Sequence, residues 1–278
     1  MRKLFLLFFI ICISYSESNR KIITIGGSVT EIVFELGLGD EVIAVDQSSV
    51  SPSIVTELPQ VGYIRMISAE GILSLNPNII LTTTDIGPPK VIDQLKQSGV
   101  EFYIYDSAYS LEGIISLIKN ISNDLKINNK GLELINEVNN IDRKIEKLKK
   151  NKKSQPKMVF FMNPSIGSFT AAGASTKADY FIKYLGGDNV FSNQFKKYSK
   201  VTKENIVNLN PDIILAGSTK GGNEEDILST FYNKDEFKSL NAIKNKDVIY
   251  LNMGKYLTFG SNFTKNVYEL LNQMQNWE

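Results

Sequence analysis

Residues 59–82 read PQVGYIRMISAEGILSLNPNIILT, and the second half of this segment is the best guide to the architecture because it occurs twice in the chain. MISAEGILSLNPNIILT at 66–82 aligns without a gap on KVTKENIVNLNPDIILA at 200–216. Each copy starts a helix with a hydroxyl N-cap, Ser68 or Thr202, and ends it at Asn-Pro before a continuous apolar run. Such a run is typical of a strand buried on both faces. A single pair of copies this far apart predicts two similar α/β lobes.

Length and charge limit the classes of function. The chain has 278 residues, 42% of them apolar, which is enough for two lobes with cores of their own. Its 31 basic and 30 acidic side chains give no sign of a nucleic-acid partner. There is no histidine, which excludes His-ligated metals and His-containing catalytic triads. A metal would find only Tyr, Met, Asp or Glu as ligands.

The N-terminus has the pattern of an export signal. Basic Arg2 and Lys3 precede an apolar core at residues 4–13, and Ser14-Tyr15-Ser16 follows as a small-x-small cleavage site. We therefore expect residues 1–16 to be a signal peptide and the protein to be exported to the periplasm. The only cysteine, Cys12, lies inside this segment. It is a candidate lipidation site, although Ile11 before it is not small.

The segment predicted as the N-terminal lobe, 17–127, alternates strands with helices. Its expected strands are 21–25, 41–46, 79–84 and 100–105, and its expected helices are 28–37, 88–98 and 110–124. This alternation with short loops predicts a mostly parallel sheet covered by helices. Ser28 and Glu31 have the spacing of a capping box at the start of the first helix.

Gly26-Gly27, just before that helix, allows two interpretations. Unpaired backbone N–H groups and the helix dipole at such a turn can bind an anionic group, with Gly27 and Ser28 as contacts. The glycines can equally serve only the tight turn. The pattern is not GxGxxG, so no nucleotide site follows from it.

A long helix is predicted to connect the lobes. Apolar residues recur at three- and four-residue spacing through 129–151, and we assign 128–153 to this connection. At 1.5 Å per residue the helix would be roughly 33 Å long, enough to reach from one lobe to the other. The C-terminal lobe, 154–278, then begins with a strand at 158–162, a Gly/Ser/Ala loop, and a helix capped near Ser175 or Thr176. It ends with a helix from Phe263.

Tyr63 and Arg65, in the Gly-Tyr-x-Arg turn before the first repeat, are the candidate site residues. An extended loop would place both side chains on one face. Tyrosinate is a known axial ligand of ferric haem, and an arginine can bind a propionate. From these residues alone, a tyrosine packed in a loop beside a surface arginine is an equally open interpretation.

Several blocks of the sequence resemble the periplasmic haem-binding proteins of bacterial ABC importers, the HmuT-like group within the vitamin B12 and siderophore type of substrate-binding protein. They are GGSVTEIVFELGLGDEVIAVDQSS, LPQVGYIRMISAEGILSLNPNIIL, AAGASTKADYFIKYLGGDNVF, YSKVTKENIVNLNPDIIL and LTFG. The resemblance covers nearly the whole chain after the signal. It implies two Rossmann-like α/β lobes joined by one long helix, the class III periplasmic binding protein fold.

The resemblance also implies roles for individual residues. The tyrosine of the motif binds haem iron, which corresponds to Tyr63, with Arg65 beside it. A glutamate at equivalent places on the two lobes, Glu70 and Glu204, pairs with the two permease subunits. The alternative is that both glutamates only stabilise helix N-termini.

Two departures from the family pattern leave the contacts of the second lobe open. Some members use a histidine there, and this chain has none. Iron would therefore be five-coordinate through Tyr63, or take a second ligand such as Met162, Met253 or Tyr256. Where related sequences have an arginine near the end, this chain has Asn262 in TFGSN, with Lys255 as a candidate substitute.

These patterns predict a binding protein that captures haem between two lobes and delivers it to a dimeric ABC permease with its ATPase. We expect it to be monomeric and not an enzyme. The near alternative is the same scaffold carrying a ferric siderophore or a corrinoid. The distant alternative is an exported α/β enzyme, for which no Gly-x-Ser-x-Gly nucleophile motif is present.

Overall fold

The computed structural model describes residues 20–150, 154–165, 167–219 and 223–274. The predicted signal peptide, the candidate lipidation site Cys12 and the last residues assigned to the connecting helix lie outside the described residues. Within the described ranges, no helix combines the length and the apolar character that crossing a membrane requires.

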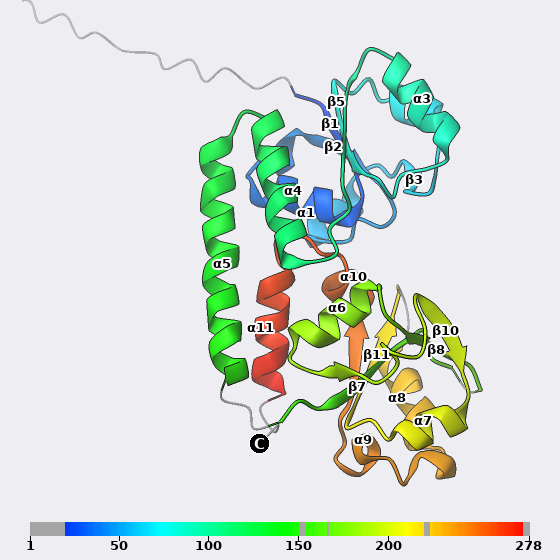
Figure 1. The fold of residues 1–278 in the computed structure, drawn as a ribbon. Helices are drawn as coiled ribbons and strands as arrows, with labels where there is room; N and C mark the ends of the chain where they lie inside the picture. The colour runs from blue at the N-terminus through cyan, green and yellow to red at the C-terminus, as the bar shows by residue number, and fades with distance from the viewer. Residues whose placement is uncertain (1–19, 151–153, 166, 220–222, 275–278) are drawn as a thin grey trace, which may run out of the picture.

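The N-terminal lobe is a parallel four-stranded sheet in the order β2-β1-β5-β6 (Figure 1). Its strands are β1 (Ile22–Ile25), β2 (Val42–Val45), β5 (Ile79–Thr83) and β6 (Glu101–Tyr105). Its helices are α1 (Gly27–Glu35), α2 (Ala69–Leu73), α3 (Pro89–Gln97) and α4 (Leu111–Asp124), with a small hairpin of β3 (Gly62–Tyr63) and β4 (Met66–Ile67). The central strands β1 and β5 are fully buried, as their apolar runs predict.

The C-terminal lobe is a mixed sheet in the order β10-β8-β7-β11-β12, with β9 also paired to β7. Its strands are β7 (Lys157–Met162), β8 (Phe169–Ala172), β9 (Asp188–Asn189), β10 (Tyr198–Val201), β11 (Ile213–Ser218) and β12 (Val248–Asn252). Its helices are α6 (Lys177–Tyr184), α7 (Lys203–Leu209), α8 (Glu224–Tyr232), α9 (Asn241–Lys244), α10 (Met253–Tyr256) and α11 (Phe263–Gln273). The antiparallel pair β8–β10 is a correction, because we expected only a Gly/Ser/Ala loop before α6. Phe169 is buried there, and this anchors the strand in the core.

The prediction of two lobes joined by one long helix is confirmed. Helix α5 (Asn128–Lys150) extends beside both lobes, with α4 packed on it from the first lobe and α11 from the second (Figure 1). Leu134, Val138 and Ile145 face inward from α5 and are buried in a core cluster that includes residues of both lobes. One continuous apolar core therefore joins the two lobes.

The two repeated segments have equivalent local structures. Ser68 Oγ accepts a hydrogen bond from the N–H of Gly71 at 3.3 Å, and Thr202 Oγ1 accepts one from Asn205 at 3.2 Å. Both are N-caps, as predicted, of α2 and α7. The repeat therefore specifies the same helix start in each lobe.

The repeats also connect each helix to its sheet in the same way. Asn78 Oδ1 accepts from the N–H of Lys21 at 2.8 Å, and Asp212 Oδ2 accepts from the N–H of Lys157 at 2.9 Å. In each lobe a polar side chain after the Asn-Pro turn thus fixes the start of the neighbouring parallel strand. This equivalence supports the interpretation of the repeat as one structural unit used twice.

The expected capping box at Ser28 and Glu31 is wrong. The N-cap of α1 is Gly26, and no side chain caps this helix. Glu31 instead is 3% exposed and turns toward the other lobe, where its Oε1 accepts hydrogen bonds from the N–H of Asn262 at 2.5 Å and from Ser261 Oγ at 3.4 Å. Local spacing suggested a cap, but the side chain serves a contact between lobes.

This contact makes stability depend on pH. Desolvation raises the pKa of Glu31 from 4.5 to about 7, the N–H of Asn262 opposes that shift, and Glu35 nearby adds to it. Between pH 4.5 and about 7, Glu31 stays protonated in the folded protein but is ionised in the unfolded chain. The contribution of Glu31 to the free energy of unfolding is therefore complete below pH 4.5 and is lost as pH rises toward 7.

We expect Glu31→Gln to be more stable than the wild type above pH 7, by up to about 3 kcal/mol, and similar to it below pH 4.5. The amide keeps an acceptor oxygen for Asn262 but has no charge to desolvate. Urea unfolding across this pH range measures the difference, with exposed Glu57→Gln as the control. Parallel stability profiles for wild type and Glu31→Gln would contradict the assignment.

Candidate functional site

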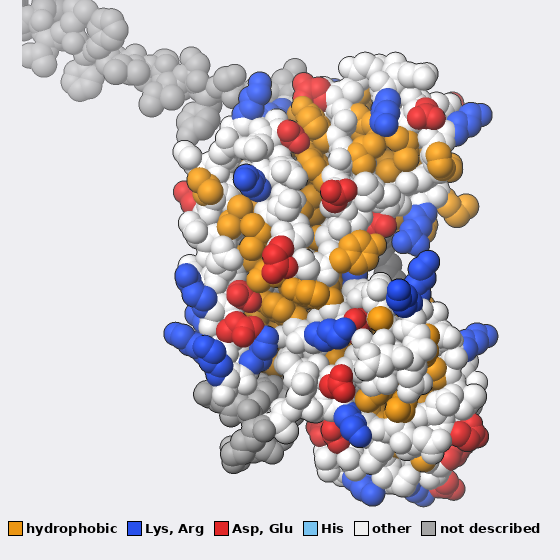
Figure 2. Space-filling view, viewed as in Figure 1, with side chains coloured by type: hydrophobic (Ala, Val, Ile, Leu, Met, Phe, Trp, Pro, Cys, Tyr) orange, Lys and Arg blue, Asp and Glu red, His pale blue; other side chains and the backbone are white. Residues whose placement is uncertain are grey.

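A cavity of about 180 Å³ lies between the two lobes. The N-terminal lobe lines it with Gly26, Gly27, Ser28, Ser48, Tyr63, Ile64, Arg65, Thr83 and Asp85, and the C-terminal lobe with Lys177, Leu257 and Thr258. Figure 2 shows basic side chains on both lobes at the side of the molecule where the lobes meet. Four of the predicted contacts, Gly27, Ser28, Tyr63 and Arg65, are thus brought together in one cavity.

The β3–β4 hairpin positions Tyr63 in this cavity. Tyr63 and Met66 are opposite each other in the hairpin, and Ile64-Arg65 forms its turn. The Ile64 side chain is buried, and its carbonyl accepts from the N–H of Gly87 at 2.9 Å. The hairpin is therefore anchored from behind, while Tyr63 is 43% and Met66 79% exposed. We expected an extended loop; the hairpin is tighter, yet Tyr63 and Arg65 both reach the cavity.

A buried carboxylate holds the Gly26-Gly27 turn against the loop after β2. Asp46 Oδ1 accepts from the N–H of Gly26 at 2.8 Å and from Ser49 Oγ at 2.7 Å, and Oδ2 accepts from the N–H of Ser48 at 2.9 Å. Gly26 has φ 105°, a conformation that favours glycine. Asp46 therefore supports one wall of the cavity. We did not predict this role; its signal was an acidic residue directly after an apolar strand.

The charged groups of the cavity come from both lobes. Arg65 Nη2 lies 3.9 Å from Asp85 Oδ1, and Asp85 also accepts a hydrogen bond from Ser107 Oγ at 2.8 Å. Lys177, the first residue of α6, contributes an ammonium from the opposite lobe. Desolvation lowers the pKa of Lys177, and Asp85 partly opposes that shift. Lys177 was not predicted; the only sequence signal was a lone cation after the N-cap Thr176.

The other predicted contacts of the second lobe lie away from this cavity. Tyr256 is buried against Phe181, with ring centroids 5.8 Å apart. Lys255 Nζ is paired with Glu269 Oε2 at 3.2 Å in a separate hollow of about 460 Å³ that Glu31 also lines.

Neither methionine candidate lines the cavity either. Met162 ends β7 and Met253 starts α10, and both pack partly buried against the core. Roles for Met162, Met253, Lys255 and Tyr256 in ligand binding stay predictions.

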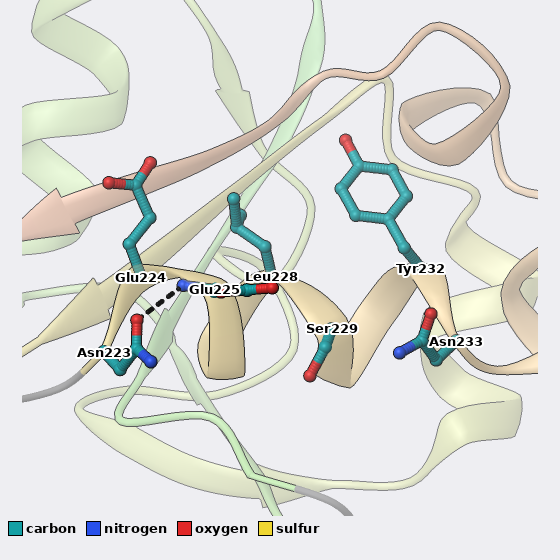
Figure 3. A pocket seen from close by; sticks show the side chains of 7 residues that line it. All are labelled: Asn223, Glu224, Glu225, Leu228, Ser229, Tyr232 and Asn233. Carbon is teal, nitrogen blue, oxygen red and sulfur yellow. Dashed lines mark hydrogen bonds between the residues drawn. The ribbon is translucent and has the colours of Figure 1, made fainter.

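A larger hollow, of about 540 Å³, lies over α8 and is lined by different residues from those of the interlobe cavity. Figure 3 shows its lining side chains in a row along one helix, among them Glu224, Leu228 and Tyr232. Its lining residues come from one end of one lobe, and none of the predicted site residues is among them. The interlobe cavity is therefore the better candidate site.

We expect Asp46→Ala to destabilise the protein by roughly 3 kcal/mol, because it leaves buried donors without acceptors. The N–H of Gly26 loses its acceptor, and the hydroxyl of Ser49 loses Asp46 and keeps only Thr30 Oγ1, at 2.7 Å, as a partner. Urea unfolding measures the change, with exposed Asp93→Ala as the control. Equal midpoints for the two variants would show that Asp46 does not support the turn.

Comparisons with known proteins agree with this architecture. The vitamin B12-binding protein of Vibrio campbellii is 28% identical over 198 residues, which cover 71% of this chain and 70% of that protein. The periplasmic heme-binding protein RhuT from Roseiflexus sp. RS-1, in apo form, is 25% identical with a TM-score of 0.82, covering 91% of this chain and 97% of that one.

A second solved structure, the periplasmic heme-binding protein BhuT in complex with two hemes, is 25% identical with a TM-score of 0.83, covering 92% of this chain and 97% of that one. The model of one family, described as "Periplasmic binding protein", matches residues 22–253, from β1 to the start of α10. Two lobes, the connecting helix α5 and this match together place the chain in the periplasmic binding protein family.

Proposed function

We propose that this protein captures haem in the opening between its two lobes, with Tyr63 as the axial ligand of the iron, and delivers it to an ABC permease. The proposal rests on the exposure of the Tyr63 side chain and on its lack of a hydrogen-bond partner. This side chain lines the interlobe cavity and is 43% exposed, and no group among the described residues hydrogen-bonds its hydroxyl. A phenol held out from a rigid hairpin without an internal partner suits an external ligand.

The chemistry of ferric iron supports Tyr63 in this role. Tyrosinate is an established axial ligand of haem iron, and this chain offers no histidine as a competitor. Arg65 follows in the hairpin turn, so its cation lies near the negative charge of a bound phenolate or propionate. The names of the structurally similar proteins RhuT and BhuT agree with haem as the ligand.

The size of the cavity indicates how haem would enter. At about 180 Å³ it is smaller than the roughly 300 to 1,000 Å³ of pockets that enclose a ligand of drug size. We infer that the lobes move apart to admit the ligand, or that haem inserts by one edge and leaves the other near Met66. The exposed Met66, beside Tyr63 on the hairpin, would then contact the macrocycle.

A corrinoid is the second candidate ligand, because curated relatives at 24 to 29% identity are named vitamin B12-binding proteins. A corrinoid brings its own cobalt coordination and needs no protein tyrosinate. The unpartnered hydroxyl of Tyr63 therefore favours haem. We propose no catalytic activity for either ligand.

Delivery would use one exposed glutamate on each lobe. Glu70 lies in the first turn of α2 and Glu204 in the first turn of α7, the two helices of the repeat, and both side chains are exposed. Two equivalent carboxylates on two similar lobes suit a partner with two-fold symmetry, such as a permease dimer.

We expect ferric haem to bind the protein lacking residues 1–16 saturably, with the absorption spectrum of a high-spin tyrosinate complex, and Tyr63→Phe to lose that spectrum because it cannot supply the phenolate. Tyr103→Phe, on β6 away from the cavity, is the matched control and should behave as wild type. An absorption titration makes the measurement. Identical titrations for Tyr63→Phe and wild type would show that Tyr63 is structural. Binding of cyanocobalamin but not haem would favour the corrinoid.

We expect the double variant Glu70→Ala/Glu204→Ala to bind haem like the wild type. Cells that carry this variant in place of the wild-type protein should grow less when haem is their sole iron supply. The matched control is Glu112→Ala/Glu225→Ala, which removes exposed glutamates from the first turns of α4 and α8. Both double variants lose the same helix-end stabilisation, of about 0.3 to 1 kcal/mol per site. Equal growth of the two would refute docking by Glu70 and Glu204.

A further inference from the structure

Lys177 places a cation at the interlobe cavity, where Asp85 acts on it electrostatically but makes no ion pair with it. It is the first residue of α6 and lines the cavity from the lobe opposite Tyr63 and Arg65. Its Nζ donates one hydrogen bond, to the carbonyl of Thr258 at 3.3 Å, although an ammonium has three donors. Among the described residues, no carboxylate lies within 4.0 Å of this nitrogen.

Aromatic rings hold the ammonium of Lys177 in place. Nζ lies 5.3 Å from the ring centroid of Tyr109 and 5.3 Å from that of Phe259, one from each lobe. The ring faces attract a cation, but they offer no oxygen or nitrogen atom that could accept a hydrogen bond from the ammonium. Burial lowers the pKa of Lys177 and Asp85 only partly opposes that shift, so an anion beside Nζ would stabilise the charged form further.

The remaining walls of the cavity also favour an anion. Helices α1 and α6 both begin there, with Gly27 and Ser28 as the first residues of α1, so two positive helix ends face the same space. Arg65 adds a second cationic side chain, and Asp85 is the acidic residue among those that line the cavity. Asp85 faces two cations and two helix N-termini, and the buried Asp46 behind the wall partly offsets the N-terminus of α1 through its hydrogen bond with the N–H of Gly26. Lys177 is thus a cation with hydrogen-bond donors still open to an anion.

We propose that Lys177 binds a carboxylate of the ligand, so that the ligand class is a metalloporphyrin with free propionates. This inference rests on the proposed function. The carboxylate oxygen accepts hydrogen bonds from Nζ, and Arg65 of the other lobe is the second cation in reach of a ligand at Tyr63. Because Lys177 and Arg65 belong to different lobes, a bound dicarboxylate draws the lobes together. Esterified porphyrins, whose side chains are neutral, lack this interaction.

The test compares ferric haem with ferric haem dimethyl ester in the same solvent mixture. We expect wild type to bind haem more tightly than the ester, and Lys177→Met to lose roughly ten- to hundred-fold in affinity for haem but little for the ester. Lys177→Arg, which keeps the charge, should retain most of the preference. Lys244→Met, on exposed α9 at the far end of the same lobe (Figure 1), is the control.

The outcomes separate this inference from the proposed function. If wild type and Lys177→Met prefer haem over the ester by the same factor, Lys177 does not bind the carboxylate, while haem binding by Tyr63 stands. If Lys177→Met changes the iron spectrum and leaves that preference unchanged, the amine contacts the metal and the inference is wrong. If wild type binds neither porphyrin, both the inference and the proposed function fail. Thermal unfolding of each variant establishes that it is folded.

Discussion

Helix α5 packs against both lobes, and this packing determines how the lobes face each other across the cavity. One apolar cluster contains α5 residues such as Val138 and Ile145 together with Ile118 of the first lobe and Phe263 of the second. Each lobe alone presents only part of a binding site. Because a shared core is costly to pull apart, the cavity between Tyr63 and Lys177 has defined walls even without a ligand.

Within this frame the two lobes contribute different chemistry to the cavity. The N-terminal lobe offers Tyr63 on an anchored hairpin and the Gly26-Gly27 turn held by Asp46. The C-terminal lobe offers Lys177 and Thr258, which approach the turn so closely that a Cβ on Gly27 would lie 3.2 Å from Thr258 Cγ2. The same Cβ would lie 3.0 Å from the carbonyl oxygen of Ser48, so both its own lobe and the other lobe leave little room for a side chain at position 27.

Features that depend on short stretches of sequence could be predicted. The repeat predicted two lobes because caps and apolar runs act locally, and Ser68 and Thr202 are indeed N-caps. Features that depend on the approach of distant segments could not. Glu31 has the spacing of a capping residue, but its partner Asn262 is near the other end of the chain. The roles of Asp46 and Lys177 likewise depend on groups that only the tertiary structure brings close to them.

The candidate site follows the same division. Tyr63 and Arg65 share the short hairpin at residues 62–67, so a local motif was enough to place both in the cavity. The methionine and tyrosine candidates of the second lobe were proposed from residue type, and Lys255 was proposed as the substitute for an arginine of the related sequences. Lys255 and Tyr256 lie away from the cavity because α10 packs beside α11. Which side chain faces another lobe depends on that packing, and no periodicity in the sequence reports it.

A crystal structure of the protein with ferric haem would show which atom of the protein holds the iron. Our account predicts iron bound to Tyr63 Oη, with the macrocycle between the lobes and its propionates toward Arg65 and Lys177. Iron held by a residue outside the interlobe cavity, or a macrocycle bound there with no bond from Tyr63 to the metal, would contradict it.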